Sequence, residues 1–157
     1  MAANNLLDKL REILATDLDR ETKGARIAAA IREANAYRWV GVYDVDMERG
    51  LVANIAWSGP GAPAYSTFSV TKGLTSRVIA EKRTVNTGDV ASDPSYLTAL
   101  DSTRSEMIVP VLDAAGSVIG TIDVESERLN AFDPATQAMF EEYARLLAAF
   151  WRQKDGF

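Results

Sequence analysis

The chain contains no cysteine and no histidine among its 157 residues. The missing cysteines exclude thiol nucleophiles, disulfide bonds, thiolate metal sites and attachment of a chromophore through sulfur. The missing histidines exclude imidazole metal ligation, haem ligation through histidine and a Ser-His-Asp catalytic arrangement. We therefore expect no catalytic residues of these kinds, no cofactor and no metal centre.

Positive charge is also scarce, because 17 Lys and Arg residues stand against 22 Asp and Glu residues and leave a net charge of -5. Binding to a phosphate backbone relies on clustered Lys and Arg, so nucleic acid is not an expected partner. The sequence has no apolar run long enough to cross a bilayer, and its first residues lack a basic segment followed by an apolar core. We expect no membrane partner and a cytoplasmic location.

Length and composition match one globular domain, with 47% apolar and 25% charged residues. A chain of this size buries about two-thirds of its unfolded surface and needs no disulfide or metal to stabilise it. There is no internal repeat and no interdomain linker in the sequence. Residues 1–157 are therefore expected to form a single domain.

The periodicity of apolar residues predicts helices at both ends of the chain and a sheet between them. Helical spacing covers about 6–14 and 20–36, and a last helix begins after Asp133-Pro134. Between them we expect strands at 38–45, 51–57, 67–70, from 85, 105–112 and 117–126, a helix at 73–82 and a short helical turn at 94–100. This order predicts an α+β fold of three layers, α/β/α, with a central antiparallel sheet of about six strands and the N- and C-terminal helices packed on one face.

The two terminal helices carry more apolar side chains than one sheet face needs, notably Leu6, Leu10, Phe150 and Trp151. An exposed apolar surface of that kind usually marks an interface between subunits. We expect a homodimer through the terminal helices. The alternative is that these side chains only cover the sheet.

Three acidic residues lie in the last predicted hairpin, whose strands flank the turn 113–116. Folding the strands together predicts Glu106 opposite Asp123, with Glu125 two residues further along. Like charges that face each other across a strand pair repel by roughly 3 kcal/mol at about 5 Å and an effective dielectric near 20. A cation or a proton is expected there, unless the three acids lie in water at the end of the hairpin, where salt screens them.

The first predicted strand places Trp39, Gly41 and Tyr43 on one face. A glycine between two rings leaves a floor without a side chain, which predicts a slot for a small molecule. Aromatic faces beside carboxylates suit an ammonium group, through cation–π attraction and ion pairing. Ordinary core packing of the two rings is the alternative.

A helix is predicted to begin at the segment Lys72, Gly73, Leu74 and Thr75. The free N–H groups of a helix start, with a lysine nearby, bind a carboxylate or another anion. If this helix start faces the acids, the pocket has one positive and one negative end. An amino acid, which is a zwitterion, would satisfy both ends.

Two other uses of the acids are weaker hypotheses. A divalent cation on three carboxylates would lack ligands, because Ca²⁺ usually takes six or more oxygens. Paired carboxylates also serve glycoside hydrolysis, but this short chain has no long loops to hold a sugar chain.

Several segments of the chain resemble the GAF domain family, and the resemblance covers about residues 3–151. The segments are WVGVY at 39–43, KGLTS at 72–76, DV at 89–90, RSEMIVPV at 104–111 and IGTIDVES at 119–126. Within that family they are most similar to the free methionine (R)-sulfoxide reductases. The resemblance implies a GAF-like fold and a pocket formed by Trp39, Tyr43, Glu106, Asp123 and Glu125, with Glu125 where an Asp is more usual.

The chain departs from those reductases at the residues that do their chemistry. The resemblance implies that cysteine thiolates attack the sulfoxide in that family, whereas the matching positions here hold Tyr65, Thr75 and Ala99. None of these side chains performs thiol chemistry. Tyr65 is also expected to fill part of the space that the reaction would need.

These observations predict a non-catalytic GAF domain that binds a small metabolite with an amino group and acts as a sensor or signalling module. Two alternatives stay open. One is a degenerate reductase that uses an unrecognised reductant, and the other is a structural dimerisation module with an empty or collapsed pocket.

Overall fold

The computed structural model describes residues 2–97 and 102–152 of the chain. The elements follow in the order α1 (Ala2–Leu14), α2 (Arg20–Ala34), β1 (Trp39–Asp46), β2 (Leu51–Ser58), β3 (Thr67–Ser69), α3 (Gly73–Glu81), β4 (Val85–Thr87), the 3-10 helix η1 (Val90–Ser92), β5 (Ser105–Leu112), β6 (Val118–Ser126) and α4 (Pro134–Arg152). Among the described helices, none has both the length and the apolar composition to cross a membrane.

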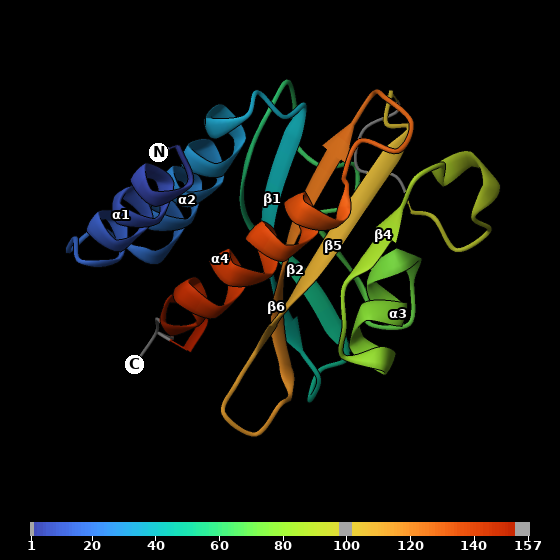
Figure 1. Ribbon diagram of the computed structural model, residues 1–157. Coiled ribbons are helices and arrows are strands. Elements are labelled where there is room, and N and C mark those ends of the chain that lie inside the picture. Colours follow the sequence, from blue (N-terminus) through green and yellow to red (C-terminus); the bar gives the residue numbers. More distant parts are fainter. Residues whose placement is uncertain (1, 98–101, 153–157) are drawn as a thin grey trace.

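The strands form one six-stranded sheet in the order β3-β2-β1-β6-β5-β4, and every neighbouring pair is antiparallel. The first hairpin, β1–β2, therefore joins the last hairpin, β5–β6, in the middle of the sheet. Figure 1 shows α4 crossing in front of the sheet, with α1 and α2 beside it. This arrangement confirms the predicted α+β fold and the packing of the terminal helices on one face.

Two Asp residues cap the starts of α2 and α4, and the cap at Asp133 is the one that the sequence predicts. The carboxylate of Asp19 accepts a hydrogen bond of 2.7 Å from the backbone N–H of Thr22. Asp133 accepts one of 2.8 Å from the N–H of Thr136, and the helix then begins at Pro134. Both caps satisfy N–H groups that would otherwise have no partner within the helix.

The main core lies between the sheet and the layer formed by α1, α2 and α4. Alternate residues of β1, β5 and β6 point into it, and the helices meet them with large apolar side chains. Its fully or almost fully buried members include Val40, Val42, Met107, Val109, Val111, Ile122 and Val124 from the strands and Leu10, Ile27, Ile31, Phe140 and Leu147 from the helices.

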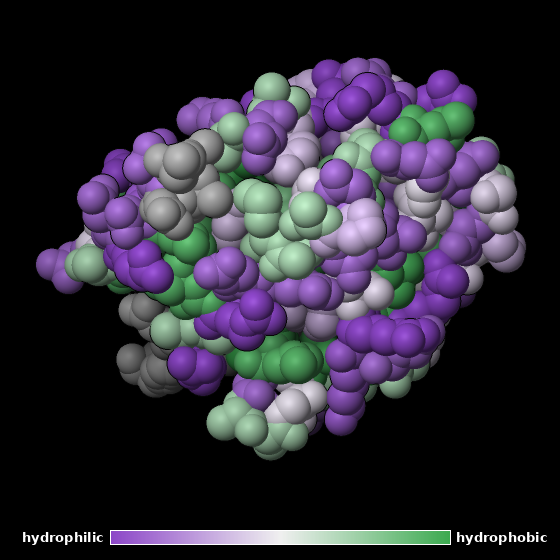
Figure 2. Space-filling model, viewed as in Figure 1, coloured by the Kyte–Doolittle hydropathy of each residue, from purple (hydrophilic) through white to green (hydrophobic). Residues whose placement is uncertain are grey.

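The apolar surface on which the predicted homodimer was based is not exposed. Leu6, Leu10, Phe150 and Trp151 are all buried within the single chain. The face that carries α4 shows hydrophobic atoms in separate patches among polar side chains (Figure 2). The homodimer stays a prediction, but these four residues do not support it, because α1 and α4 bury them in the main core.

The prediction of a helical turn at 94–100 is wrong for the part that the structure describes. Asp93-Pro94 leads into a turn at 94–95, and residues 98–100 lie outside the described residues. The helical turn lies earlier, at Val90–Ser92, where the side chain of Asp89 accepts from the N–H of Ala91. One carboxylate oxygen of Asp93 accepts a hydrogen bond of 2.9 Å from the backbone N–H of Ser95, and the other forms an ion pair with Arg77 of α3, so Asp93 caps a turn at 94–95.

The last turn of α4 is hydrogen-bonded to β1, and a glycine on β6 makes room for this contact. The indole N–H of Trp151 donates a hydrogen bond of 2.8 Å to the backbone carbonyl of Tyr43. Gly120 makes room for it, because a Cβ at this position would lie 2.0 Å from Nε1 of Trp151. The absence of a side chain on β6 therefore allows α4 to contact the main chain of β1.

Candidate functional site

The second face of the sheet carries the polar residues of the central strands. Alternation along β1 places Trp39, Gly41 and Tyr43 on this face, as predicted. The register sets Trp39 opposite Glu125 and Gly41 opposite Asp123. The rings of Trp39 and Tyr43 on β1 therefore lie next to the carboxyl groups of Asp123 and Glu125 on β6, on the same face of the sheet.

The predicted pairing of Glu106 with Asp123 is wrong, because Glu106 lies directly opposite Glu125. Two features shift the register. The turn extends to Ser117, whose N–H and carbonyl both bond to Asp113, and the pairing changes between Val111 and Leu112. The three carboxyl groups still share one face, because the net shift is two residues and a sheet face repeats every two residues.

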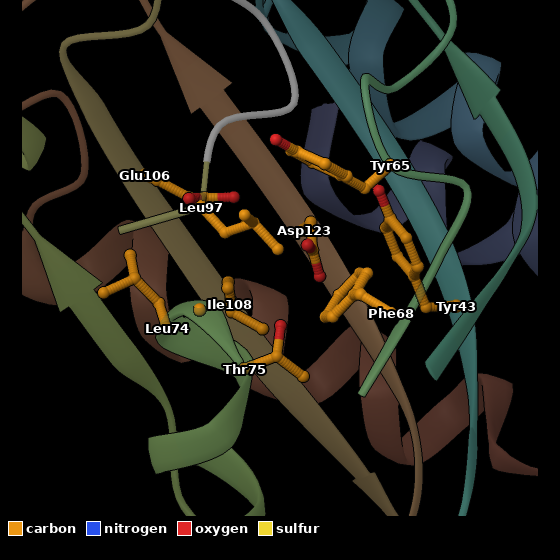
Figure 3. Close-up of a pocket in the computed structure, with 10 residues that line it drawn as sticks. Tyr43, Tyr65, Phe68, Leu74, Thr75, Leu97, Glu106, Ile108 and Asp123 are labelled. Carbon is orange, nitrogen blue, oxygen red and sulfur yellow. The ribbon is translucent and has the colours of Figure 1, made fainter. Parts of the chain in front are cut away.

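A small cavity lies on this face between β1, β5, β6 and the start of α3. Its lining residues are Tyr43, Tyr65, Phe68, Gly73, Leu74, Thr75, Leu97, Glu106, Ile108 and Asp123. Figure 3 shows Tyr43, Tyr65 and Phe68 along one side and Leu74, Leu97 and Glu106 along the other, with Asp123 between them. The cavity volume is about 20 Å³, which is space for about one water molecule.

The three acids are buried, and two of them accept hydrogen bonds from hydroxyl groups. Glu106, Asp123 and Glu125 are 3%, 5% and 0% exposed. The hydroxyl of Thr103 donates to Glu125, and the hydroxyl of Thr121 donates to Asp123 over 2.9 Å. The acids therefore do not lie at a hydrated end of the hairpin, which was the alternative reading of the sequence.

Burial is the main cause that raises the pKa of Glu106 well above its ordinary value, and the charges of Glu125 and Asp123 raise it further. A hydrogen bond between the carboxyl groups of Glu106 and Glu125 acts in the same direction. Burial likewise raises the pKa of Asp123, where the hydrogen bond from Thr121 opposes the effect and the charge of Glu125 adds to it. The pKa of the Tyr43 phenol is raised by burial first and then by the three acids. Charge of the opposite sign, or a proton, relieves this crowding.

The start of α3 reaches the same cavity through Gly73, Leu74 and Thr75. Gly73 has a φ of +69°, a backbone conformation that glycine adopts without strain. Lys72 occupies the N-cap position, but its side chain makes no cap hydrogen bond. The positive end of the helix therefore faces the same space as the carboxyl groups of Glu106 and Asp123.

Trp39 does not line the cavity. Its indole is fully buried and donates a hydrogen bond of 2.9 Å to the carbonyl of Gly61. A Cβ on Gly41 would lie 2.3 Å from the Trp39 ring and 3.1 Å from the Tyr43 ring. The space above Gly41, predicted as a slot, is therefore filled by the rings themselves.

The structure brings most of the predicted site residues to one place. Seven of them line the cavity, namely Tyr43, Tyr65, Gly73, Leu74, Thr75, Glu106 and Asp123. Glu125 and Trp39 lie on the same face of the sheet without lining the cavity, and Lys72 is exposed at the start of α3. Within the described residues, no group of three or more acids has a geometry that could hold a metal ion.

Sequence reasoning missed the hydroxyl groups of Thr103 and Thr121 and the apolar lining residues Leu97 and Ile108. Thr121 precedes Asp123 by two residues and Ile108 follows Glu106 by two, so strand alternation could have placed both on the same face. Thr103 and Leu97 come from the connection before β5, where no periodicity predicts the direction of a side chain.

The positions that the sequence comparison matched to reductase cysteines lie at this cavity where they can be described. Tyr65 and Thr75 both line it, and Tyr65 is 48% exposed at its mouth. Ala99 lies outside the described residues. The cavity therefore contains a phenol and a secondary alcohol at two of the three matched positions.

The chain belongs to the GAF domain family, because the model of that family matches residues 17–151. GAF domain-containing protein A of Dictyostelium discoideum is 29% identical over 143 residues, which are 91% of this chain and 88% of that protein. The chain is also similar to solved structures of free methionine-R-sulfoxide reductases. Free methionine-R-sulfoxide reductase from Neisseria meningitidis, in complex with its substrate, matches with a TM-score of 0.84 and 29% identity over 96% of this chain and 88% of that chain.

A second reductase, the type II free methionine-R-sulfoxide reductase from Thermoplasma acidophilum, is 32% identical with a TM-score of 0.76. The match covers 85% of this chain and 96% of that chain. The resemblance inferred from the sequence segments is thereby confirmed. This chain differs from that family in having no cysteine.

Proposed function

We propose that this GAF domain binds a free amino acid or a similar zwitterion without chemical conversion and acts as a sensor or signalling module. The ammonium group binds at Glu106 and Asp123, and the carboxylate binds at the first N–H groups of α3. The observation that carries the proposal is that one cavity joins these two carboxyl groups to Gly73, Leu74 and Thr75. Opposite charges at the two ends of one small space match the charge pattern of an amino acid.

Tyr43 and Phe68 supply the apolar and aromatic wall for the side chain of the ligand. Their ring centroids are 6.0 Å apart in an edge-to-face arrangement. The cavity, at about 20 Å³, is smaller than an amino acid. Ligand entry therefore requires Tyr65 and Leu97 to move apart at the mouth, and the exposed position of Tyr65 permits this.

The side chains that the cavity contains support binding without conversion. A thiolate is the nucleophile that forms and exchanges disulfides, and this chain has none. Thr75 is 3% exposed, and neither it nor Tyr65 has a histidine that could act as its general base. Purified protein is expected to leave free methionine (R)-sulfoxide unreduced in the presence of a thiol reductant.

Thermal unfolding with matched ligands tests the binding proposal. L-Methionine or its (R)-sulfoxide, at about 100 times its Kd, is expected to stabilise the native protein by about 2.7 kcal/mol. For a chain of this length that free energy corresponds to a rise in Tm of about 5 to 10 °C. N-acetyl-L-methionine lacks the ammonium group and L-methionine methyl ester lacks the carboxylate, so both are expected to give little or no rise.

Two variants serve as controls for that measurement. Asp123→Asn keeps the shape of the side chain and removes a charge, so the rise in Tm with L-methionine is expected to disappear. Glu142→Gln removes an exposed acid of α4 and is expected to respond as the wild type does. Equal responses to L-methionine and its N-acetyl form would contradict the proposed role of the acids.

The small size of the cavity favours a second candidate, a structural module whose pocket is closed by Tyr65 and Phe68. Such a module would dimerise through its terminal helices. No amino acid would then change the Tm at millimolar concentration, and light scattering would give twice the mass of the chain. A monomer that responds to L-methionine would exclude this candidate.

A further inference from the structure

The pair Glu106 and Glu125 brings two buried carboxyl groups together. The two residues are directly opposite across β5 and β6 and are 3% and 0% exposed. Directly opposite residues of an antiparallel pair have Cβ atoms about 5 Å apart, so two ionised carboxylates there repel each other with little screening by water. A proton on one of the two groups removes this repulsion and lets that group donate a hydrogen bond to the other.

The surrounding hydroxyl groups distinguish the two partners. Thr103 donates a hydrogen bond to Glu125, and Thr121 donates one to Asp123. Within the described part of the chain no hydroxyl group donates to Glu106. A donated hydrogen bond favours the ionised form of the carboxyl group that accepts it. The proton of the pair is therefore more stable on Glu106 than on Glu125.

We infer that Glu106 holds a proton in the empty pocket and that Thr103 acts as a positioning residue that keeps the proton there by stabilising ionised Glu125. The inference deepens the proposed function and rests on it for its role, because an ammonium ligand would take the place of this proton. The site thus exchanges a proton for a cation. Burial and the neighbouring charges, which raise the pKa of Glu106, act in the same direction.

None of the described residues that face Glu106 carries a positive charge. β1 contributes Tyr43, β6 contributes Asp123 and Glu125, and the loop before β3 contributes Tyr65. β4 places Thr87 opposite Glu106. α3 contributes Leu74 and Thr75, while Lys72 at its start does not line the cavity. Because no described side chain neutralises the acids, a proton takes that role when no ligand is bound.

Carbon-13 NMR of protein labelled at the Glu side-chain carboxyl carbons tests the inference without any ligand. The resonance of Glu106 is assigned from its loss in the Glu106→Gln variant. In the wild type this resonance is expected at the position of a protonated carboxyl at pH 7. An ionised Glu106 at pH 7 would overturn the inference.

Two substitutions at Thr103 test the positioning role. Thr103→Val keeps the shape and removes the hydroxyl, so the proton affinity of the pair is expected to rise about tenfold and the titration to move to higher pH. Thr103→Ser restores a hydroxyl and is expected to return the titration toward the wild type. An unchanged titration in Thr103→Val would remove Thr103 from the mechanism. If Thr103→Val fails to fold, a wild-type titration in Thr103→Ser and a protonated Glu106 still support the inference.

The outcomes separate this inference from the proposed function. If Glu106 is protonated but L-methionine does not change the Tm, the proposed amino-acid binding is wrong and the protonation of Glu106 stands. If L-methionine binds but Glu106 is ionised at pH 7 in the ligand-free protein, the proton exchange is wrong and amino-acid binding stands.

Discussion

Replacing Gly120 with alanine is expected to lower the free energy of unfolding by about 4 kcal/mol. The new Cβ would lie 2.0 Å from Nε1 of Trp151 and 2.7 Å from the backbone carbonyl oxygen of Tyr43. These two atoms form a buried hydrogen bond of 2.8 Å. Overpacking costs about 1–3 kcal/mol, and a buried polar group without its partner costs about 1–3 kcal/mol more.

Urea unfolding followed by tryptophan fluorescence measures this loss. Gly61→Ala is the matched control, because a Cβ at Gly61 meets no heavy atom within 4 Å. That variant is expected to stay within about 0.5 kcal/mol of the wild type. A Gly120→Ala protein as stable as Gly61→Ala would show that α4 does not need the contact between Trp151 and β1.

Without ligand, the protein is expected to become less stable as the pH rises above about 5, whereas most proteins are near their maximal stability between about pH 5 and 8. Burial and neighbouring charges raise the pKa of Glu106 and of Asp123 in the folded state. Between the ordinary carboxyl pKa of about 4 and the raised one, the folded protein binds more protons than the unfolded chain. The stability that these two protonated groups contribute is therefore fully present below their pKa in the unfolded chain. It is lost as the pH rises through their raised pKa in the folded protein. Each extra proton contributes at most about 1.4 kcal/mol per pH unit.

Urea unfolding at pH 5, 6, 7 and 8 measures this dependence. Glu106→Gln is expected to flatten the curve and to be more stable than the wild type at pH 8, because an amide donates to Glu125 without ionising. Glu142→Gln, which removes an exposed acid, is expected to keep the wild-type curve. The capping acids Asp19 and Asp133 have a lowered pKa, so their contribution changes below this pH range. A wild type that gains stability up to pH 8 would refute the buried proton.

Local sequence signals predicted most of the fold. The period-two pattern from Trp39 to Val45 placed the rows of β1 on their correct faces, and the Asp caps gave the start of α4 within one residue. The same signal at Asp93 gave a capped turn and not the predicted helical turn: one oxygen of its carboxylate accepts from the N–H of Ser95 and the other forms an ion pair with Arg77. A cap signal depends on long-range contacts that a short segment of sequence does not contain.

The sequence predicted most residues of the candidate site, but not which acids lie opposite each other across β5 and β6. Alternation placed the acids on one face, but the shift at the β5–β6 turn moved Glu106 from Asp123 to Glu125. A shift of this kind depends on hydrogen bonds within the turn and on packing beyond it. The size of the cavity depends on how far Tyr65 and Leu97 close over it, which no periodicity encodes.

The hydrogen bond from Trp151 to β1 has a mechanical consequence. It holds the main chain of Tyr43, and the ring of the same residue forms a wall of the cavity on the opposite side of the sheet. If a ligand binds as proposed and displaces this ring, the displacement would act on a strand whose carbonyl is hydrogen-bonded to the last turn of α4. Binding would then be coupled to the placement of that helix through a single residue, across the thickness of the sheet.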